Sequence, residues 1–182
     1  LSLVGSEMCI RDRLFWFDSA TIFKKPIDGA LEALAAQGFW ALRSQMPLAQ
    51  KCDPRVLEAL NVPLEVRHVR EYAAGAVGFD LATSLGRQLV EDWARHALIP
   101  GHIVPEGHAP FHKHDQALLN CLLAKAMFAG QLEPTLEEID ISSADPSRMI
   151  STRNYVPPGR PLWADPWYRL AGSVWKTADR LY

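Results

Sequence analysis

Residues that can bind a metal ion are concentrated in one stretch of the sequence, from residue 99 to residue 116. Four histidines and two acidic residues lie there: His102, His108, His112, His114, Glu106 and Asp115. Imidazole and carboxylate groups together are common ligands of transition metals, so one hypothesis is a metal centre. The alternative is a loop in which most of these histidines do no chemistry and His112 or His114 forms a hydrogen bond near a phosphate.

Two further side chains are candidates for a transfer reaction. Glu71 precedes a glycine-containing stretch and could act as a general base on an acceptor hydroxyl, provided that it lies within hydrogen-bond reach. Its alternative interpretation is a solvated charge at the start of a strand. Arg153 could bind a phosphate through two parallel hydrogen bonds, and a surface ion pair is equally compatible with its position.

Two aspartates stand where an element ends or begins. The apolar run 14–17 predicts a buried strand that delivers Asp18 into a loop. Asp115 opens a stretch with helical periodicity, directly after a long irregular segment of a type that is often functional. Both also have structural interpretations, since Asp18 can form a strand-end turn and Asp115 can stabilise the start of a helix.

Strands and helices are expected to alternate along the chain. The patterns predict helices at 26–38, 55–60, 84–97 and 115–127, with Asp53 and Ser84 as N-caps and Gly38 at the end of the first. They predict strands at 14–17, 39–42, 71–80, 138–141 and 149–155, and a loop at 99–114. This order predicts an α/β sheet layered by helices, which binds ligands beyond the carboxyl ends of its strands. The small residues around Gly75 predict a strand that passes close to another backbone or to a ligand.

The composition is that of one packed domain. Of 182 residues, 48% are hydrophobic and 22% are charged, and the net charge of −2 gives no electrostatic footprint for nucleic acid or an anionic membrane surface. No apolar run reaches the length of a membrane span. Cys52 and Cys121 lack the paired spacing of a zinc site or a disulfide framework, so a reduced, cytoplasmic setting is expected.

The first thirteen residues are interpreted as foreign to the domain. Residues 3–13, LVGSEMCIRDR, resemble a translated sequencing adapter. We therefore expect native sequence to begin near Leu14 and the true upstream coding sequence, including any signal or anchor, to be missing. The chain as it stands is then expected to be inactive and poorly soluble, because the strand from Leu14 would have lost a sheet neighbour.

The rest of the chain contains an ordered series of short motifs. They are FWFDSAT at 15–21, AAGAVGF at 73–79, Trp93, PEG at 105–107 and HKHDQ at 112–116. In this order they resemble the C-terminal part of nucleotide-sugar glycosyltransferases of the GT-A fold. The resemblance covers 14–155, which leaves 156–182 as a C-terminal extension that wraps the domain. It implies an incomplete GT-A-like, Rossmann-like sheet whose N-terminal strands are missing.

The resemblance also implies roles for individual residues. Asp18, Ser19, Gly75, His114, Gln116 and Arg153 would bind the donor, while Asp115 and Glu71 would be catalytic. In this family a divalent cation held by strand-end carboxylates neutralises the diphosphate leaving group, so Asp18 would bind Mn²⁺ or Mg²⁺. The usual second carboxylate is absent, since Ala20 occupies its position, and metal dependence is therefore in question.

Three functions are carried forward. The first is transfer of a sugar from a nucleotide-diphosphate donor to a hydroxyl acceptor, a saccharide in the simplest case, by the full-length protein. The second is a metal-binding protein or metal-dependent enzyme that uses the histidine-rich loop at 102–114. The third is a non-catalytic relative that binds carbohydrate or protein. The first requires Asp18 and the pair at 115–116 to lie within about 15 Å of each other, so that they can share one donor.

Overall fold

The computed structural model describes residues 5–10, 12–18, 21–107, 111–135, 137–138 and 150–152. The predicted site residues Ser19 and Arg153 lie outside this part of the chain. So do His108, most of the strand expected at 138–141, and the C-terminal extension.

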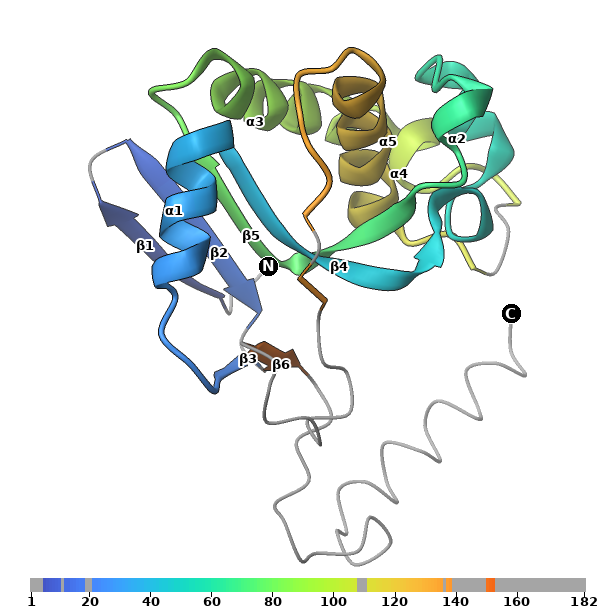
Figure 1. Ribbon diagram of the computed structural model, residues 1–182. Helices are drawn as coiled ribbons and strands as arrows, with labels where there is room; N and C mark the ends of the chain where they lie inside the picture. The colour runs from blue at the N-terminus through green and yellow to red at the C-terminus, as the bar shows by residue number, and fades with distance from the viewer. Residues whose placement is uncertain are drawn as a thin grey trace, which may run out of the picture.

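The central element is a four-stranded sheet with the order β1-β2-β5-β4 (Figure 1). Its strands are β1 (Gly5–Ile10), β2 (Arg13–Asp18), β5 (Arg70–Asp80) and β4 (Phe39–Pro47), and each neighbouring pair is antiparallel. A second, two-stranded antiparallel sheet joins β3 (Thr21–Phe23) to β6 (Ile150–Thr152). The mixed α/β character is thus confirmed. In an antiparallel sheet, however, the carboxyl ends of adjacent strands lie at opposite edges, so in these four strands they do not gather at one edge as expected.

The N-terminal segment forms the edge of this sheet. β1 pairs with β2 over its whole length, from Gly5 opposite Asp18 to Ile10 opposite Arg13. On its other side β2 pairs with β5. The expectation that the strand from Leu14 lacks a sheet neighbour is therefore wrong, because β2 has a hydrogen-bonded strand on both sides.

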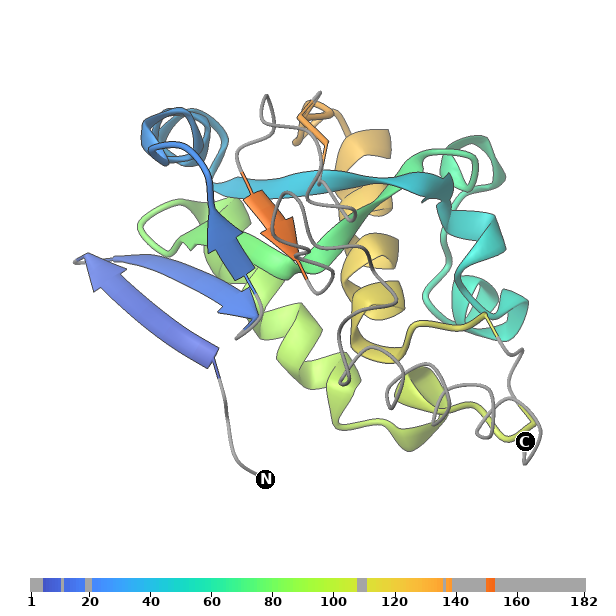
Figure 2. The ribbon, with the colours of Figure 1, turned by 90° about the horizontal axis from the view of Figure 1, so that it is seen from below.

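One face of the sheet is covered by α1 (Asp28–Gln37), as the view from below shows (Figure 2). The core on this face combines three strands with the helix and consists of Phe15, Phe17, Ala30, Leu34, Trp40, Leu42, Ala73 and Ala76. As predicted, the helix ends at Gly38, whose φ of 78° is in the left-handed region that glycine adopts without strain.

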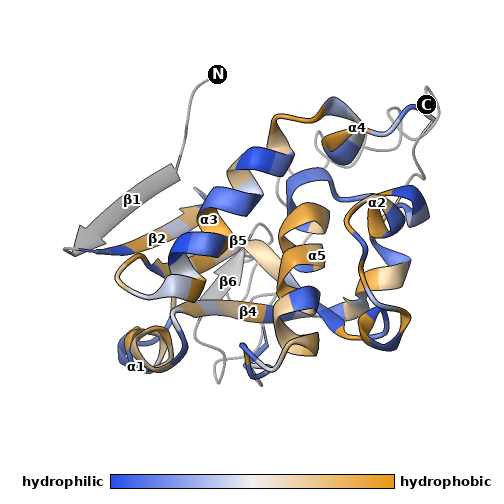
Figure 3. Cartoon of the chain, turned by 90° about the horizontal axis from the view of Figure 1, so that it is seen from above, coloured by the Kyte–Doolittle hydropathy of each residue, from blue (hydrophilic) through white to orange (hydrophobic). Residues whose placement is uncertain are grey.

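The opposite face is covered by α3 (Ser84–Ala97) and α5 (His114–Phe128), which also contact each other. Figure 3 shows hydrophobic residues concentrated on α5, whereas the outer side of α3 is hydrophilic. The short helix α2 (Pro54–Ala59) and the 3₁₀ turns Leu48–Gln50 and Leu64–Val66 complete this layer. α5 is the central helix of the larger core because most of its residues are buried.

Several local predictions are confirmed and others need correction. Asp53 caps α2 by accepting a hydrogen bond from the Arg55 backbone N–H. The N-cap of α3 is Thr83 and not Ser84, since the Thr83 hydroxyl accepts from the Gly86 N–H at 3.0 Å. The expected loop at 99–114 contains a short helix, α4 (Pro100–Ile103). At 138–141, Glu138 forms an isolated bridge with β4, and the residues that follow it lie outside the described part.

Within the described ranges, no helix has the length and apolar character needed to cross a membrane.

Candidate functional site

Beyond the point where β2 ends, side chains of α5 form the hydrogen bonds with the backbone of β5. The last pair between the two strands joins Phe17 to Ala76. Beyond this pair, the Asn120 amide forms hydrogen bonds with both backbone groups of Tyr72. Asn120 Oδ1 accepts from the Tyr72 N–H at 2.5 Å, and Asn120 Nδ2 donates to the Tyr72 carbonyl at 2.8 Å. The Ala74 N–H donates to Gln116 Oε1 at 3.3 Å. Residues four apart lie on the same face of a helix, so α5 presents both amides to the strand as a substitute partner.

Gly75 lies between Ala76, the last residue of β5 that pairs with β2, and Ala74, which is hydrogen-bonded to Gln116 of α5. A Cβ at this position would lie 2.5 Å from Asp18 Oδ2 and 2.9 Å from Asp18 Cγ, so the carboxylate rests directly against the Gly75 backbone. The strand is also irregular here: β5 pairs with β4 at Val77 and next at Tyr72, with a register shift between the two pairs. Such bulges re-aim side chains and are frequent next to active sites. The strand was expected to pass close to another backbone or to a ligand at Gly75; the group found there is instead the Asp18 side chain.

The two predicted motifs meet at this point of the sheet. Asp18 Oδ2 touches the position of Gly75, and Gln116 Oε1 accepts from the preceding residue, Ala74. Less than two residues of backbone join these contacts, so the two side-chain oxygens lie no more than about 13 Å apart. This separation satisfies the condition for sharing one donor.

Glu71 lies four residues before Gly75 on the same strand, a span of about 13 Å. Its side chain is fully buried, which makes the alternative of a solvated charge wrong. Oε1 accepts hydrogen bonds from the Ser44 hydroxyl at 3.1 Å and from Lys113 Nζ. Oε2 is buried with no hydrogen-bond partner. A carboxylate oxygen that is shielded from water and lacks a donor can accept a proton or a hydroxyl hydrogen bond.

The residues at the start of α5 point in different directions. Asp115 is exposed in the first turn, and its backbone carbonyl accepts from Trp93 Nε1 at 3.0 Å. His114 is exposed, has a φ of 44°, and places Nδ1 3.0 Å from the Ile103 carbonyl. Asp115, which the sequence resemblance implied to be catalytic, is therefore exposed to solvent in the first turn of α5.

His112 has a structural role. Its Nδ1 accepts from the Asp53 N–H at 3.1 Å, and its Nε2 lies 3.1 Å from the Ile103 carbonyl. Because Nδ1 is the acceptor, Nε2 carries the proton and donates to that carbonyl. Both nitrogens of this buried ring are thus occupied by backbone groups, which corrects the expectation of a hydrogen bond from His112 near a phosphate.

The other histidines of the loop do not converge either. His102 pairs with His96 of α3 through their Nδ1 atoms at 3.1 Å. No group of three or more histidine, cysteine, aspartate or glutamate residues suited to a metal ion is found among the described residues. The metal-centre hypothesis therefore has no geometric support in this part of the chain.

No protein-family model, curated protein or solved structure matches this chain. The functional argument therefore depends on the contacts around Gly75.

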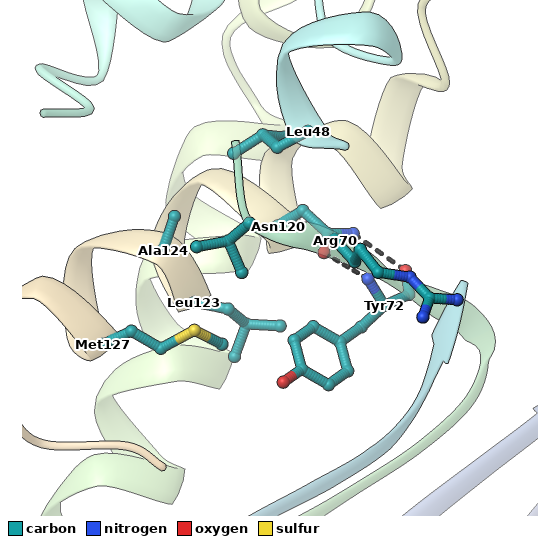
Figure 4. A pocket seen from close by; sticks show the side chains of 8 residues that line it. Leu48, Arg70, Tyr72, Asn120, Leu123, Ala124 and Met127 are labelled. Atoms are coloured by element: carbon teal, nitrogen blue, oxygen red, sulfur yellow. Dashed lines mark hydrogen bonds between the residues drawn. The ribbon is translucent and has the colours of Figure 1, made fainter. Parts of the chain in front are cut away.

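Two hollows are found in this part of the molecule. The first lies between Tyr72 and α5 and is lined by Leu48, Val69, Arg70, Tyr72, Asn120, Leu123, Ala124 and Met127 (Figure 4). It is too narrow to admit a water molecule, so it is a packing defect of the core. The second is an open depression at the start of α3, lined by Ala82, Thr83, Ser84, Arg87, Gln88 and Glu91. Neither contains a predicted site residue.

Lys113, Ser44 and Asn120 belong to the site although the sequence interpretation did not select them. Asn120 had a usable signal, because it stands four residues after Gln116 and thus on the same face of the predicted helix. Lys113 lies inside the motif at 112–116, but its partner Glu71 is 42 residues away. Ser44 had no signal, since it faces Glu71 only through the pairing of β4 with β5.

Proposed function

We propose that this domain belongs to a glycosyltransferase that moves a sugar from a nucleotide-diphosphate donor to a hydroxyl acceptor, within an incomplete GT-A-like sheet. The observation that carries the proposal is that Asp18 and Gln116 contact neighbouring residues of β5, Gly75 and Ala74 respectively. Three residues from separate sequence motifs, expected to share one donor, lie together. The motif series and this geometry support the same function.

Asp18 binds the donor at the end of β2. In such transfers the leaving diphosphate gains negative charge, which a divalent cation can neutralise. Mg²⁺ is commonly held by one or two carboxylates together with substrate phosphates, so a single aspartate followed by Ser19 fits Mg²⁺ or Mn²⁺ as a ligand set. Gly75 contributes by having no side chain, which leaves its backbone accessible beside the carboxylate.

Gln116 and Asp115 orient the sugar. Gln116 Oε1 is fixed by the Ala74 N–H, which directs the rest of the amide and holds the start of α5 against the strand. The exposed carboxylate of Asp115 hydrogen-bonds to hydroxyl groups of the donor or acceptor, and His114 lies beside it near the phosphates. Holding the reacting groups in place in this way can supply a large part of the rate enhancement.

Glu71 is the proposed general base. Lys113 and Ser44 hold its Oε1, which leaves Oε2 to take the proton of the acceptor hydroxyl. The side chain of Lys113 is 37% exposed, so Lys113 is the member of the ion pair that solvent reaches. Proton removal at the moment of transfer typically contributes a factor of about 10²–10⁴ to the rate.

The test uses the purified protein. Release of nucleoside diphosphate is measured with a panel of nucleotide-diphosphate sugars, for the natural protein and for Asp115→Asn. We expect release with at least one donor and a loss of about a hundredfold in the variant. Asp92→Asn, on the outer side of α3, is the control. Equal release by Asp115→Asn would contradict the proposal.

A further inference from the structure

Two cysteines that are remote in sequence lie in contact in the larger core. The sulfur atoms of Cys52 and Cys121 are 3.6 Å apart, and both residues have no exposed surface. Cys52 directly precedes the N-cap of α2, and Cys121 lies in the middle of α5. Both are free thiols. A disulfide bond is about 2.05 Å long, so the sulfurs need to approach by only about 1.5 Å.

We propose that Cys52 and Cys121 form an oxidisable dithiol site, which a small peroxide converts to an intramolecular disulfide. In the first step the Cys52 thiolate attacks one peroxide oxygen. An S–O bond forms, the O–O bond breaks, and the other oxygen leaves as water after taking up a proton. In the second step Cys121 attacks the Cys52 sulfur, the S–S bond forms, and the S–O bond breaks with loss of a second water molecule. Two thiols are oxidised and one peroxide is reduced.

The surroundings shift the pKa values of the two thiols in opposite directions. The hydrogen bond from Cys121 lowers the pKa of Cys52, and His112 acts in the same direction, while burial opposes them. The same hydrogen bond and burial raise the pKa of Cys121. Because the thiolate is the nucleophile, Cys52 is the attacking residue and Cys121 the resolving one.

The crosslink would act on the residues that lead into α5. The Asp53 N–H donates to His112, and the Lys113 N–H donates to the Lys51 carbonyl at 3.2 Å. The segment around Cys52 therefore already supports the residues immediately before α5. A disulfide would join this segment to the body of the same helix and fix the position of its first turn, where Asp115 and Gln116 lie.

Burial makes the site selective for the size of the oxidant. Hydrogen peroxide is small enough to enter during local opening, whereas a bulky aromatic disulfide reagent is not. We therefore expect peroxide to oxidise the folded protein and the bulky reagent to leave this pair unreacted.

The experiment treats the folded chain, in a Cys9→Ser background, with hydrogen peroxide, followed by denaturation, alkylation and mass spectrometry. The expected result is a loss of two alkylatable thiols, a mass lower by two hydrogen atoms, and a peptide that links Cys52 to Cys121. A higher midpoint of urea unfolding should accompany the crosslink. Cys52→Ser and Cys121→Ser should each abolish the linked peptide.

Peptide mapping of the unsubstituted pair decides the proposal even if a serine variant fails to fold. Two thiols that stay alkylatable, oxygen addition at Cys52 without a linked peptide, or crosslinking only after unfolding would each overturn it. All three results are independent of whether the protein is a glycosyltransferase.

Discussion

The Asp18 carboxylate lies so close to Gly75 that a Cβ on the glycine would be 2.5 Å from Asp18 Oδ2. Atoms do not approach so closely, and hence glycine is required here for the carboxylate to keep its place. Asp18 is a short side chain that can rotate, so a larger residue at position 75 would displace the carboxylate more readily than the backbone. Position 75 therefore offers a way to move Asp18 without altering it.

Gly75→Ala is expected to impair donor turnover far more than stability. Displacement of the Asp18 carboxylate by about 1 Å should reduce nucleoside diphosphate release by about a hundredfold. The free energy of unfolding should fall by only about 1–2 kcal/mol, the cost of modest overpacking. Gly101→Ala is the matched control, since a Cβ there has nothing within 4 Å. Unchanged turnover in a folded Gly75→Ala protein would show that the position of Asp18 does not matter.

Asn120→Ala should destabilise the junction between β5 and α5. The amide satisfies both backbone groups of Tyr72, as the dashed lines in Figure 4 show. Two buried groups without partners cost about 1–3 kcal/mol each, so we expect a loss of about 2–6 kcal/mol in urea unfolding. Gln88→Ala removes an amide from the exposed side of α3 and should change little. A loss for Asn120→Ala no larger than that of the control would refute the role of this amide in closing the strand edge.

The ion pair between Glu71 and Lys113 should respond asymmetrically to substitution. Lys113→Gln leaves a buried carboxylate without its cation and should cost about 3–5 kcal/mol. Glu71→Gln leaves Lys113, which is 37% exposed and can turn to solvent, so the stability loss should be smaller. Urea unfolding of both variants measures the difference. If Glu71→Gln proves the more damaging of the two, the carboxylate does not depend on Lys113.

Stability should decrease in mild acid because of His96. Burial, followed by the neighbouring His102, lowers the pKa of His96, and Lys125 and Arg95 act in the same direction against Asp92. The folded state thus favours the neutral ring. The contribution of the neutral His96 ring to the stability of the folded state is fully present above the pKa of histidine in the unfolded chain, about 6.5. This contribution is lost as the pH falls below that value.

Urea unfolding at about pH 7.5 and about pH 5.5 tests this dependence. His96→Gln should reduce the difference in unfolding free energy between the two pH values, whereas His68→Gln, at an exposed position, should leave it unchanged. An identical difference in the natural protein and His96→Gln would mean that other groups cause the acid sensitivity.

Local patterns in the sequence predicted much of the fold because their causes are local. The apolar run before Asp18, the glycine at position 38 and the capping aspartate at position 53 each act within a few residues, and each is found in the expected role. The direction of strand pairing is not local, so the antiparallel order of the sheet did not follow from the alternation of strands and helices.

The members of the proposed site were chosen from sequence motifs and stay a prediction, whereas their contacts could not be predicted from the sequence. Asp18, Gly75 and Gln116 were selected by motif, and the structure brings them together. The burial of Glu71 was not predictable, because Lys113 reaches it from another element. The contact between Cys52 and Cys121 was hidden for the same reason, since 69 residues separate them in the chain.

The most direct test of the central claim is nucleoside diphosphate release by the protein and its Asp18→Asn variant, measured across nucleotide-diphosphate sugars with and without Mn²⁺ or Mg²⁺. The account predicts release from at least one donor by the natural protein and a loss of about a hundredfold in Asp18→Asn, with the free energy of unfolding nearly unchanged. Equal release by the two proteins, or no release from any donor by the natural protein, would contradict it.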